Sequence, residues 1–215
     1  MAELPGEGEG PRRAVAGLRQ AILSGDMAPG QRLVEIDLAE MFGVSRASVR
    51  AGLAELTAEG LVERIPNRGA RVRVVSLDEA VAITECRMVL EGLCAAKAAE
   101  RATSEQIELL TQHAERMRWA VADGEALKYS ALNRDLHRMV AEFSGQAVAM
   151  ELLERLHGQI VRYQFRLSLR PGRPQTSLAE HSAIIAAIAG GDPEAAEAAS
   201  RAHLSSVLRA LRTAG

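Results

Sequence analysis

The region from residue 35 to residue 60 constrains the fold most strongly, because two short helical patterns there flank a tight turn. Apolar residues between Glu35 and Phe42 recur at helical spacing, and Gly43 suits a turn that connects two helices. Ser45 is a favourable N-cap for the second helix, and Gly60 is suited to end it. The region therefore predicts a helix-turn-helix unit.

Strand patterns follow this unit directly. Residues 61–75 contain two runs rich in β-branched side chains around a Pro-Asn-Arg-Gly turn at residues 66–69, which is typical of a hairpin. Upstream, residues 11–24 open with a proline and show helical spacing of apolar residues. These patterns predict a winged helix-turn-helix domain over residues 11–75. The Gly- and Glu-rich residues 1–10 are expected to be a disordered tail.

Beyond residue 75 the strand patterns stop, and helical patterns separated by Gly, Asp or Pro take their place. The expected helices are residues 78–101, 104–122, 125–143, 148–169, 176–189 and 193–211. Helices without strands indicate an all-α helical bundle over residues 76–215. The predicted fold class is therefore mostly α, with an N-terminal winged helix-turn-helix and an all-helical second domain.

Charge is distributed unevenly along the chain. Six Arg and three Glu lie between residues 45 and 75, although the whole chain has a net charge of −2. We therefore expect a surface for a polyanion in the first third. No apolar run approaches the roughly 20 residues of a membrane span, and no signal-peptide pattern opens the chain, so we expect a soluble, cytoplasmic protein. Cys86 and Cys94 lie about 12 Å apart along one predicted helix, too far for a disulfide, and are expected to be reduced thiols in the core.

The start of the second helix of the helix-turn-helix has the chemistry of a DNA-reading surface. Its apolar side anchors the helix to its own domain and leaves outward-facing positions at Arg46, Ala47, Ser48 and Arg50. Arginine binds guanine with two hydrogen bonds in the major groove, which gives about 1–3 kcal/mol of base discrimination. Arg68 at the hairpin tip is placed to reach an adjacent groove or the backbone. The alternative is a solvated charged face.

These residues resemble the DNA-binding domain of GntR-family bacterial transcription regulators over about Arg12 to Val75. The resemblance rests on Pro29-Gly30-Gln31-Arg32-Leu33, Leu38-Ala39, Phe42 to Arg46, Val49-Arg50, Leu53, Leu56 and Glu59-Gly60-Leu61-Val62. It implies DNA contacts by Ser45, Arg46, Ala47, Ser48, Arg50 and Gly69. The chain departs from the family at Gly52, where Ala is usual, at a cost of about 0.5–1 kcal/mol of helix stability. A second departure replaces the common Thr-Pro pair with Ala47 and Ser48.

Histidines in the second domain have the spacing of a metal site. Asn133 and His137 are four residues apart and therefore share one face of a helix. His181 and His203 lie on either side of a helix break at residues 190–193. In an antiparallel helix hairpin they would stand about 14 Å and about 16 Å from the turn, and so at nearly the same level. Three His with an amide oxygen suit Zn²⁺, Ni²⁺ or Mn²⁺.

The second domain resembles the all-helical FCD ligand-binding domain of the FadR-type branch of GntR regulators, over roughly Leu77 to Leu211. The resemblance rests on Glu85 to Glu91, Asn133 to His137, Glu180 to Ile184, Ala187-Ile188, Gly191-Asp192 and Ala202 to Leu204. In metal-binding members an Asp or Asn and three His hold the ion, which implies a ligand set of Asn133, His137, His181 and His203. Asn in place of Asp leaves this site with one less negative charge.

The same resemblance implies that Arg87 points into the cavity of the domain, where a guanidinium can bind the carboxylate of an effector. Arg162 is a second candidate for the cavity wall. Two alternatives stand beside this interpretation: Arg87 pairs with Glu91 one helical turn on, and Arg162 is a surface charge or a dimer contact. For the histidines the alternative is a packing or surface role, which is the interpretation given to His113 and His157.

The sequence therefore predicts a ligand-responsive transcription regulator rather than an enzyme. We expect a repressor that binds a near-palindromic operator in double-stranded DNA as a homodimer, with a small organic acid as effector and no membrane partner. One alternative is a metal-dependent hydrolase on a DNA-binding arm, although no Gly-x-Ser-x-Gly or His-Glu-x-x-His motif is present. The other is a regulator whose helical domain only dimerises.

Overall fold

The structure, a computed structural model, describes residues 9–66 and 68–213, except for the side chain of residue 162. The chain divides into two compact units, of which the first ends at Val75 and the second begins at Ser76. Most of the expected disordered tail, residues 1–8, lies outside the described residues. Its last two residues belong to the first helix, which begins at Glu9 and not at Pro11.

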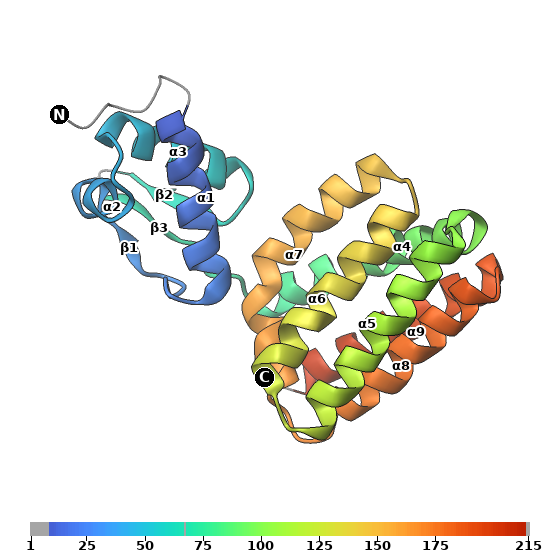
Figure 1. Cartoon of the computed structure of the whole chain (residues 1–215). Coiled ribbons are helices and arrows are strands. Elements are labelled where there is room, and N and C mark those ends of the chain that lie inside the picture. The colour runs from blue at the N-terminus through green and yellow to red at the C-terminus, as the bar shows by residue number, and fades with distance from the viewer. Residues whose placement is uncertain (1–8, 67, 214–215) are drawn as a thin grey trace. The chain divides into compact units, whose positions relative to one another are not determined.

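In its described residues, the first unit consists of three helices and a small antiparallel sheet (Figure 1). Its elements are α1 (Glu9–Ser24), β1 (Arg32–Leu33), α2 (Glu35–Phe42), α3 (Arg46–Ala58), β2 (Val62–Ile65) and β3 (Gly69–Val72). The strand order is β1-β3-β2, with Arg32 opposite Arg71 and Val62 opposite Val72. The predicted winged helix-turn-helix is therefore confirmed. Strand β1 was not expected from the sequence, and β3 ends earlier than the predicted run to residue 75.

Local signals set the turn between α2 and α3. Gly43 adopts a left-handed conformation with φ of 62°, which a residue without Cβ adopts freely, and its N–H donates to carbonyl groups of the last turn of α2. Ser45 then caps α3, because its hydroxyl accepts a hydrogen bond from the Ser48 N–H at 3.1 Å. These two residues fix where the exposed start of α3 lies.

Helices α1 and α3 approach closely at Gly52. This residue is buried, and a Cβ added to it would lie 3.4 Å from the Ala14 Cβ and 3.4 Å from the Val15 Cγ2. The apolar core around this contact joins all three helices to the sheet. It includes Val15, Leu18, Ile22, Leu33, Leu38, Val49, Leu53, Leu56, Val62 and Val72.

The second unit contains only helices among its described residues, so the all-α prediction is confirmed. The helices are α4 (Leu77–Arg101), α5 (Ser104–Ala122), α6 (Ala126–Phe143), α7 (Ala147–Ser168), α8 (Arg173–Ala189) and α9 (Pro193–Arg212). Each begins and ends within three residues of its predicted bounds. Helix α9 packs along α4 and against α8, which is joined to it by the short turn before Pro193. Figure 1 shows α8 and α9 as neighbouring antiparallel helices.

Two further sequence expectations concern the whole chain. Among the described residues, no helix is long and apolar enough to cross a membrane. Both cysteines are free thiols, but only Cys94 is buried. The expectation that Cys86 belongs to the core is wrong, because this side of α4 carries exposed residues.

Candidate functional site

The exposed start of α3 carries the two arginines expected to contact DNA. The side chains of Arg46 and Arg50 are 60% and 58% exposed. Glu35, at the first turn of α2, lies between them: its Oε2 accepts from Arg50 Nε at 2.8 Å and lies 3.6 Å from Arg46 Nη2. Glu35 was not identified from the sequence, because only the packing of α2 beside α3 brings it there.

The small residues at the start of α3 differ in exposure, although all of them were expected to face outward. Ala47 is exposed, whereas Ser48 is half-buried and its hydroxyl lies 3.0 Å from the Ser45 hydroxyl. The start of α1 covers Ser48, since a Cβ added to Gly10 would lie only 2.6 Å from its Oγ. Ser48 therefore presents less of its side chain to the exterior than Arg46, Ala47 and Arg50 do.

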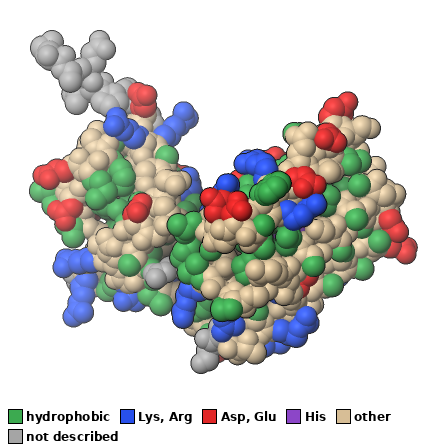
Figure 2. Space-filling model, turned by 60° about the horizontal axis from the view of Figure 1, so that its bottom comes forward, with side chains coloured by type: hydrophobic (Ala, Val, Ile, Leu, Met, Phe, Trp, Pro, Cys, Tyr) green, Lys and Arg blue, Asp and Glu red, His purple; other side chains and the backbone are tan. Residues whose placement is uncertain are grey.

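The hairpin between β2 and β3 forms the wing. Arg68 and Gly69 are exposed at its tip, and Gly69 has a φ of 87°. Arg68 lines a surface hollow together with Arg32 of β1 and Arg71 of β3. In the view of Figure 2, the basic side chains of this unit form separate groups with acidic and hydrophobic side chains between them.

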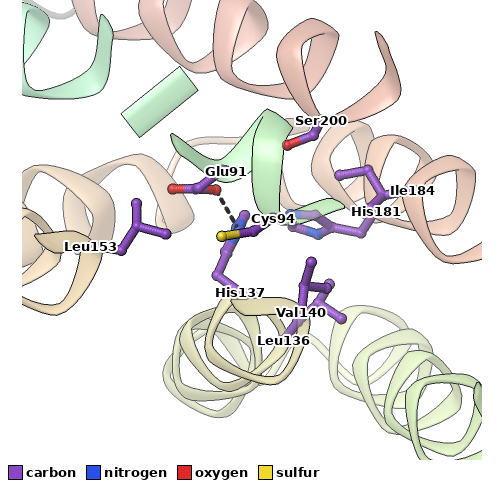
Figure 3. Close-up of a pocket in the computed structure, with 9 residues that line it drawn as sticks. All are labelled: Glu91, Cys94, Leu136, His137, Val140, Leu153, His181, Ile184 and Ser200. Carbon is purple, nitrogen blue, oxygen red and sulfur yellow. Dashed lines mark ion pairs between the residues drawn. The ribbon is translucent and has the colours of Figure 1, made fainter. Parts of the chain in front are cut away.

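In the second unit, three helices bring histidines together. His137 of α6, His181 of α8 and His203 of α9 each offer a ring nitrogen, and these atoms all lie within 4.8 Å of one another. The Nε2 atoms of His181 and His203 are 3.2 Å apart. Figure 3 shows His137 and His181 converging from different helices, with the Glu91 carboxylate beside His137. The contact between His181 and His203 agrees with the common level predicted for these two residues.

Carboxylates orient two of the three imidazoles from behind. Glu91 of α4 places its Oε2 2.8 Å from His137 Nδ1, and Glu180 of α8 places its Oε2 2.7 Å from His203 Nδ1. A carboxylate that takes the Nδ1–H leaves the Nε2 lone pair for a metal. Ionised carboxylates fit this role, since the pKa of each is below its usual value despite the opposing effect of burial. The Arg87 guanidinium is the main cause of the lowered pKa of Glu91. Hydrogen bonds from His203 and Ser206 lower the pKa of Glu180, and the Arg173 cation adds to this.

Burial keeps two of the three imidazoles, those of His181 and His203, in the neutral form that binds metals. Burial lowers the pKa of His203 to about 4, although the hydrogen bond to Glu180 opposes this, and lowers that of His181 well below its usual value. Neutral imidazoles at pH 7 offer nitrogen lone pairs to a cation. The Nε2 atom of His181 faces the Nε2 atom of His203 and is therefore the nitrogen that His181 offers to an ion. Its buried Nδ1 has no hydrogen-bond partner among the described residues. The chemistry of these donors fits a nitrogen-binding divalent ion.

Two other histidines, His113 and His157, were predicted from the sequence to have a packing or surface role and not to bind metal. His113 is buried, and its Nε2 lies 2.7 Å from the Leu132 carbonyl oxygen, a contact that joins α5 to α6. His157 of α7 lies 3.2 Å from Glu91 Oε1, and its ring centroid is 5.9 Å from that of His137. His157 thus stands behind Glu91, outside the group of three. No spacing signal in the sequence connects it with the site.

A polar cavity borders the histidines. Its wall consists of Arg87, Tyr129, Asn133, His137, Gln164, Leu167, Ser168, Arg173, Ser177, His203 and Val207. The proposed fourth ligand, Asn133, therefore lines the same space as two of the histidines. Three residues of this wall were not identified from the sequence: Tyr129, Arg173 and Ser177. Helical spacing places them on the faces of Asn133 and His181 and was an available signal.

Arg87 is 2% exposed and held on two sides. Its Nε and Nη2 lie 2.8 Å and 2.7 Å from Glu91 Oε1, and the side-chain oxygen of Gln164, in the orientation that satisfies both groups, accepts from Nη1 at 2.7 Å. The two alternatives given for Arg87 from the sequence therefore occur together: it pairs with Glu91 and it lines the cavity. Arg162 belongs to α7, but its side chain lies outside the described part of the chain.

Comparison with known proteins gives matches over both units. Residues 12–72 match the family described as bacterial regulatory proteins, gntR family, and residues 82–206 match the FCD domain. The HTH-type transcriptional repressor RspR of Escherichia coli is 26% identical over 195 residues, which cover 91% of this chain and 86% of RspR. The HTH-type transcriptional repressor NanR of Cronobacter sakazakii is 30% identical over 217 residues, covering 88% of this chain and 80% of NanR.

Solved structures share the architecture. Escherichia coli McbR/YncC superposes with a TM-score of 0.82 at 21% identity, over 100% of this chain and 99% of that one. Streptococcus agalactiae GntR superposes with a TM-score of 0.54 at 26% identity, over 93% of this chain and 99% of the other.

Proposed function

Because this chain belongs to the GntR family of bacterial regulatory proteins, with an FCD domain in its second unit, we propose that it is a metal-dependent transcription repressor that senses a small organic acid. It acts as a homodimer on a near-palindromic operator. The observation that carries this proposal is the group of three buried imidazoles beside a polar cavity, in the same chain as a winged helix-turn-helix.

The start of α3 is the proposed reading surface. Arg46 and Arg50 are free to exchange their contacts with Glu35 for DNA, because exposed ion pairs of this kind contribute only about 0–1 kcal/mol. The N-terminus of the helix favours a phosphate, and the guanidinium groups of Arg46 and Arg50 suit the hydrogen-bonding edges of guanine. Ser45 and Ala47 lie at the same end, and Arg68 and Gly69 of the wing add a second contact.

A homodimer is supported by apolar side chains that the second unit leaves exposed. Val89 and Leu93 lie one turn apart on α4, and Val148 and Leu152 lie one turn apart on α7. Helices α4 and α7 contact each other, and exposed apolar patches of this kind mark interaction surfaces. We propose that these four side chains contribute to the contact between two copies of the chain.

The proposed metal ligands are His137, His181, His203 and Asn133. Imidazole nitrogens suit Zn²⁺ and Ni²⁺ better than Mn²⁺, which prefers oxygen ligands, so the first two are the favoured ions. A bound divalent ion would supply Lewis-acid positions for oxygen atoms of a ligand. None of the four ligands carries a negative charge, and the nearby Glu91 and Glu180 are matched by Arg87 and Arg173. We therefore expect an anionic effector to balance the positive charge of the ion.

Arg87 is the proposed contact for a carboxylate of that ligand. Its four described interactions, two with Glu91 and two with Gln164, leave one of the five N–H donors of the guanidinium. Arg162 remains a candidate for the same wall. A ligand held by metal and Arg87 changes operator affinity only to the extent that it binds the two DNA-binding states differently.

The test is to select genomic DNA fragments with the full-length protein and then to measure the affinity of the enriched fragment with and without Zn²⁺ and small carboxylates. We expect a selected fragment and a carboxylate that changes its affinity only in the presence of metal. In His137→Ala the fragment should still bind, but the response to the carboxylate should be lost. Failure to enrich any fragment, with or without additives, would contradict the proposal.

A further inference from the structure

The polar cavity extends along two helices away from His137 and His203, which line it, whereas His181 is not part of its wall. On α6, Tyr129, Asn133 and His137 follow one another at intervals of four residues, and on α8 Arg173, Ser177 and His181 do the same. Such residues share one helix face at about 6 Å per interval. Both series thus lead from the histidines to a second end of the cavity, about 6–12 Å away along the helix axes.

This second end holds a buried hydroxyl with an unused hydrogen-bonding group. Tyr129 is 3% exposed, and its hydroxyl has no well-formed hydrogen bond among the described residues. Burial raises the pKa of Tyr129, and the nearby Ser177 hydroxyl and Arg173 oppose this only in part, so the phenol keeps its proton. A buried hydroxyl that lacks a well-formed hydrogen bond is unfavourable, because it has lost its bonds to water. A ligand acceptor at this position would remove that cost.

Arg173 stands beside Tyr129 in a fixed position. Its side chain is 10% exposed, Nη1 donates to Ser206 Oγ at 2.7 Å and Nη2 donates to Glu180 Oε2 at 3.1 Å. These bonds use two of its five N–H donors. Glu180, the acidic group of this end, is engaged by both Arg173 and His203. The second end therefore offers chiefly donors: a guanidinium, a phenol and the Ser177 hydroxyl.

We propose that Tyr129, Ser177 and Arg173 form a second anchor, and that the effector is a dicarboxylate whose far carboxylate binds there while its near carboxylate binds at the histidine end. This inference rests on the proposed function, because it needs the first carboxylate at the metal and Arg87. The distance between the two ends suits a chain of about four to six carbon atoms, with carbon–carbon bonds of about 1.5 Å.

The experiment uses the full-length protein loaded with Zn²⁺ and calorimetric titration with matched acids. The pairs are butyrate and succinate, pentanoate and glutarate, and hexanoate and adipate, so that each pair differs by one carboxylate. At least one diacid should bind at least about tenfold more tightly than its partner, as expected for hydrogen bonds from charged and neutral donors to a carboxylate. Tyr129→Phe should remove about tenfold of that advantage and leave the monoacid unchanged.

Tyr129→Phe is well suited to this test, because it removes only a hydroxyl that has no well-formed bond and keeps the buried ring. Ser177→Ala gives a second measurement at the same end. Tyr163→Phe is the matched control, since Tyr163 does not line the cavity, and its diacid affinity should equal that of the parent protein.

The outcomes separate the two proposals. Metal-dependent binding of monoacids with no advantage for any diacid, or a diacid advantage that survives both Tyr129→Phe and Ser177→Ala, overturns the second anchor and leaves the proposed function standing. If no acid of either series binds to the metal-loaded protein, or if binding is the same after the metal is removed, carboxylate sensing by the metal is itself wrong, and the second anchor is rejected with it.

Discussion

The Nε2 atoms of His181 and His203 face each other at 3.2 Å inside the second unit, although the two residues belong to different helices. Both side chains are almost completely buried. With Glu180 at His203 Nδ1, the His203 Nε2 carries a lone pair, and a cation or a proton between the two rings satisfies it. This contact is the geometric basis for the metal prediction.

We expect His181→Ala to lose stoichiometric binding of Zn²⁺ or Ni²⁺, because it removes one of three converging nitrogens. The measurement is equilibrium dialysis followed by elemental analysis of the folded protein. His157→Gln is the control, since His157 is half-buried nearby but lies outside the group of three, and this variant should keep its metal. Equal metal content in the two variants would reject the assigned ligand set.

Arg50→Ala and Arg46→Ala should each weaken binding to the selected DNA fragment by about 1–3 kcal/mol if the arginine contacts a guanine. An arginine that contacts only a phosphate would instead lower the slope of log affinity against log salt by about 0.9. Glu35→Gln is the matched control, because it removes the negative charge that pairs with both arginines, and it should not weaken binding. Unchanged affinity in both arginine variants would show that the start of α3 does not contact DNA.

Gly52→Ala should stabilise the first unit by about 0.5–1 kcal/mol, because alanine is the better helix former. The structure leaves room for the methyl group at ordinary contact distance from Ala14 and Val15. Urea unfolding followed by circular dichroism measures the effect. Gly52→Leu serves as the contrasting variant, since its larger side chain would push α1 away from α3 and destabilise the unit. A destabilising alanine would mean that the two helices tolerate no added atom.

The metal-free protein should lose stability as the pH falls from about 6.5 to about 4. Burial lowers the pKa of His157 and of His203 to about 4 in the folded state, whereas both titrate near 6.5 when unfolded. The unfolded chain therefore binds more protons in this range, and each histidine lowers the free energy of unfolding by about 1.4 kcal/mol per pH unit. Above pH 6.5 both states are neutral and this effect is absent.

Denaturant unfolding at pH 7, 6 and 5 measures this dependence. His157→Gln should reduce the slope of unfolding free energy against pH by about 1.4 kcal/mol per pH unit, which corresponds to one proton, because glutamine does not titrate. An identical slope in the variant would show that His157 is not held neutral in the folded protein.

The sequence by itself determined the helices, the wing hairpin and the levels of His181 and His203, but not strand β1. Gly43 and Ser45 set the turn before α3 through bonds to neighbouring residues, and the helix breaks set the bounds of α8 and α9. His181 and His203 then follow from helical rise counted from one turn, which is local geometry. Arg87 and Glu91 could be paired in advance for the same reason, as neighbours four residues apart.

Tertiary packing alone decided which groups surround these residues. Glu91 is shared by His137 from α6 and His157 from α7, and Glu180 lies behind His203 from α9, because the helices bury these faces against one another. The same packing buries the Tyr129 hydroxyl beside Arg173. Burial and charge pairing depend on contacts between distant segments, and neither periodicity nor spacing along one helix specifies which faces will meet.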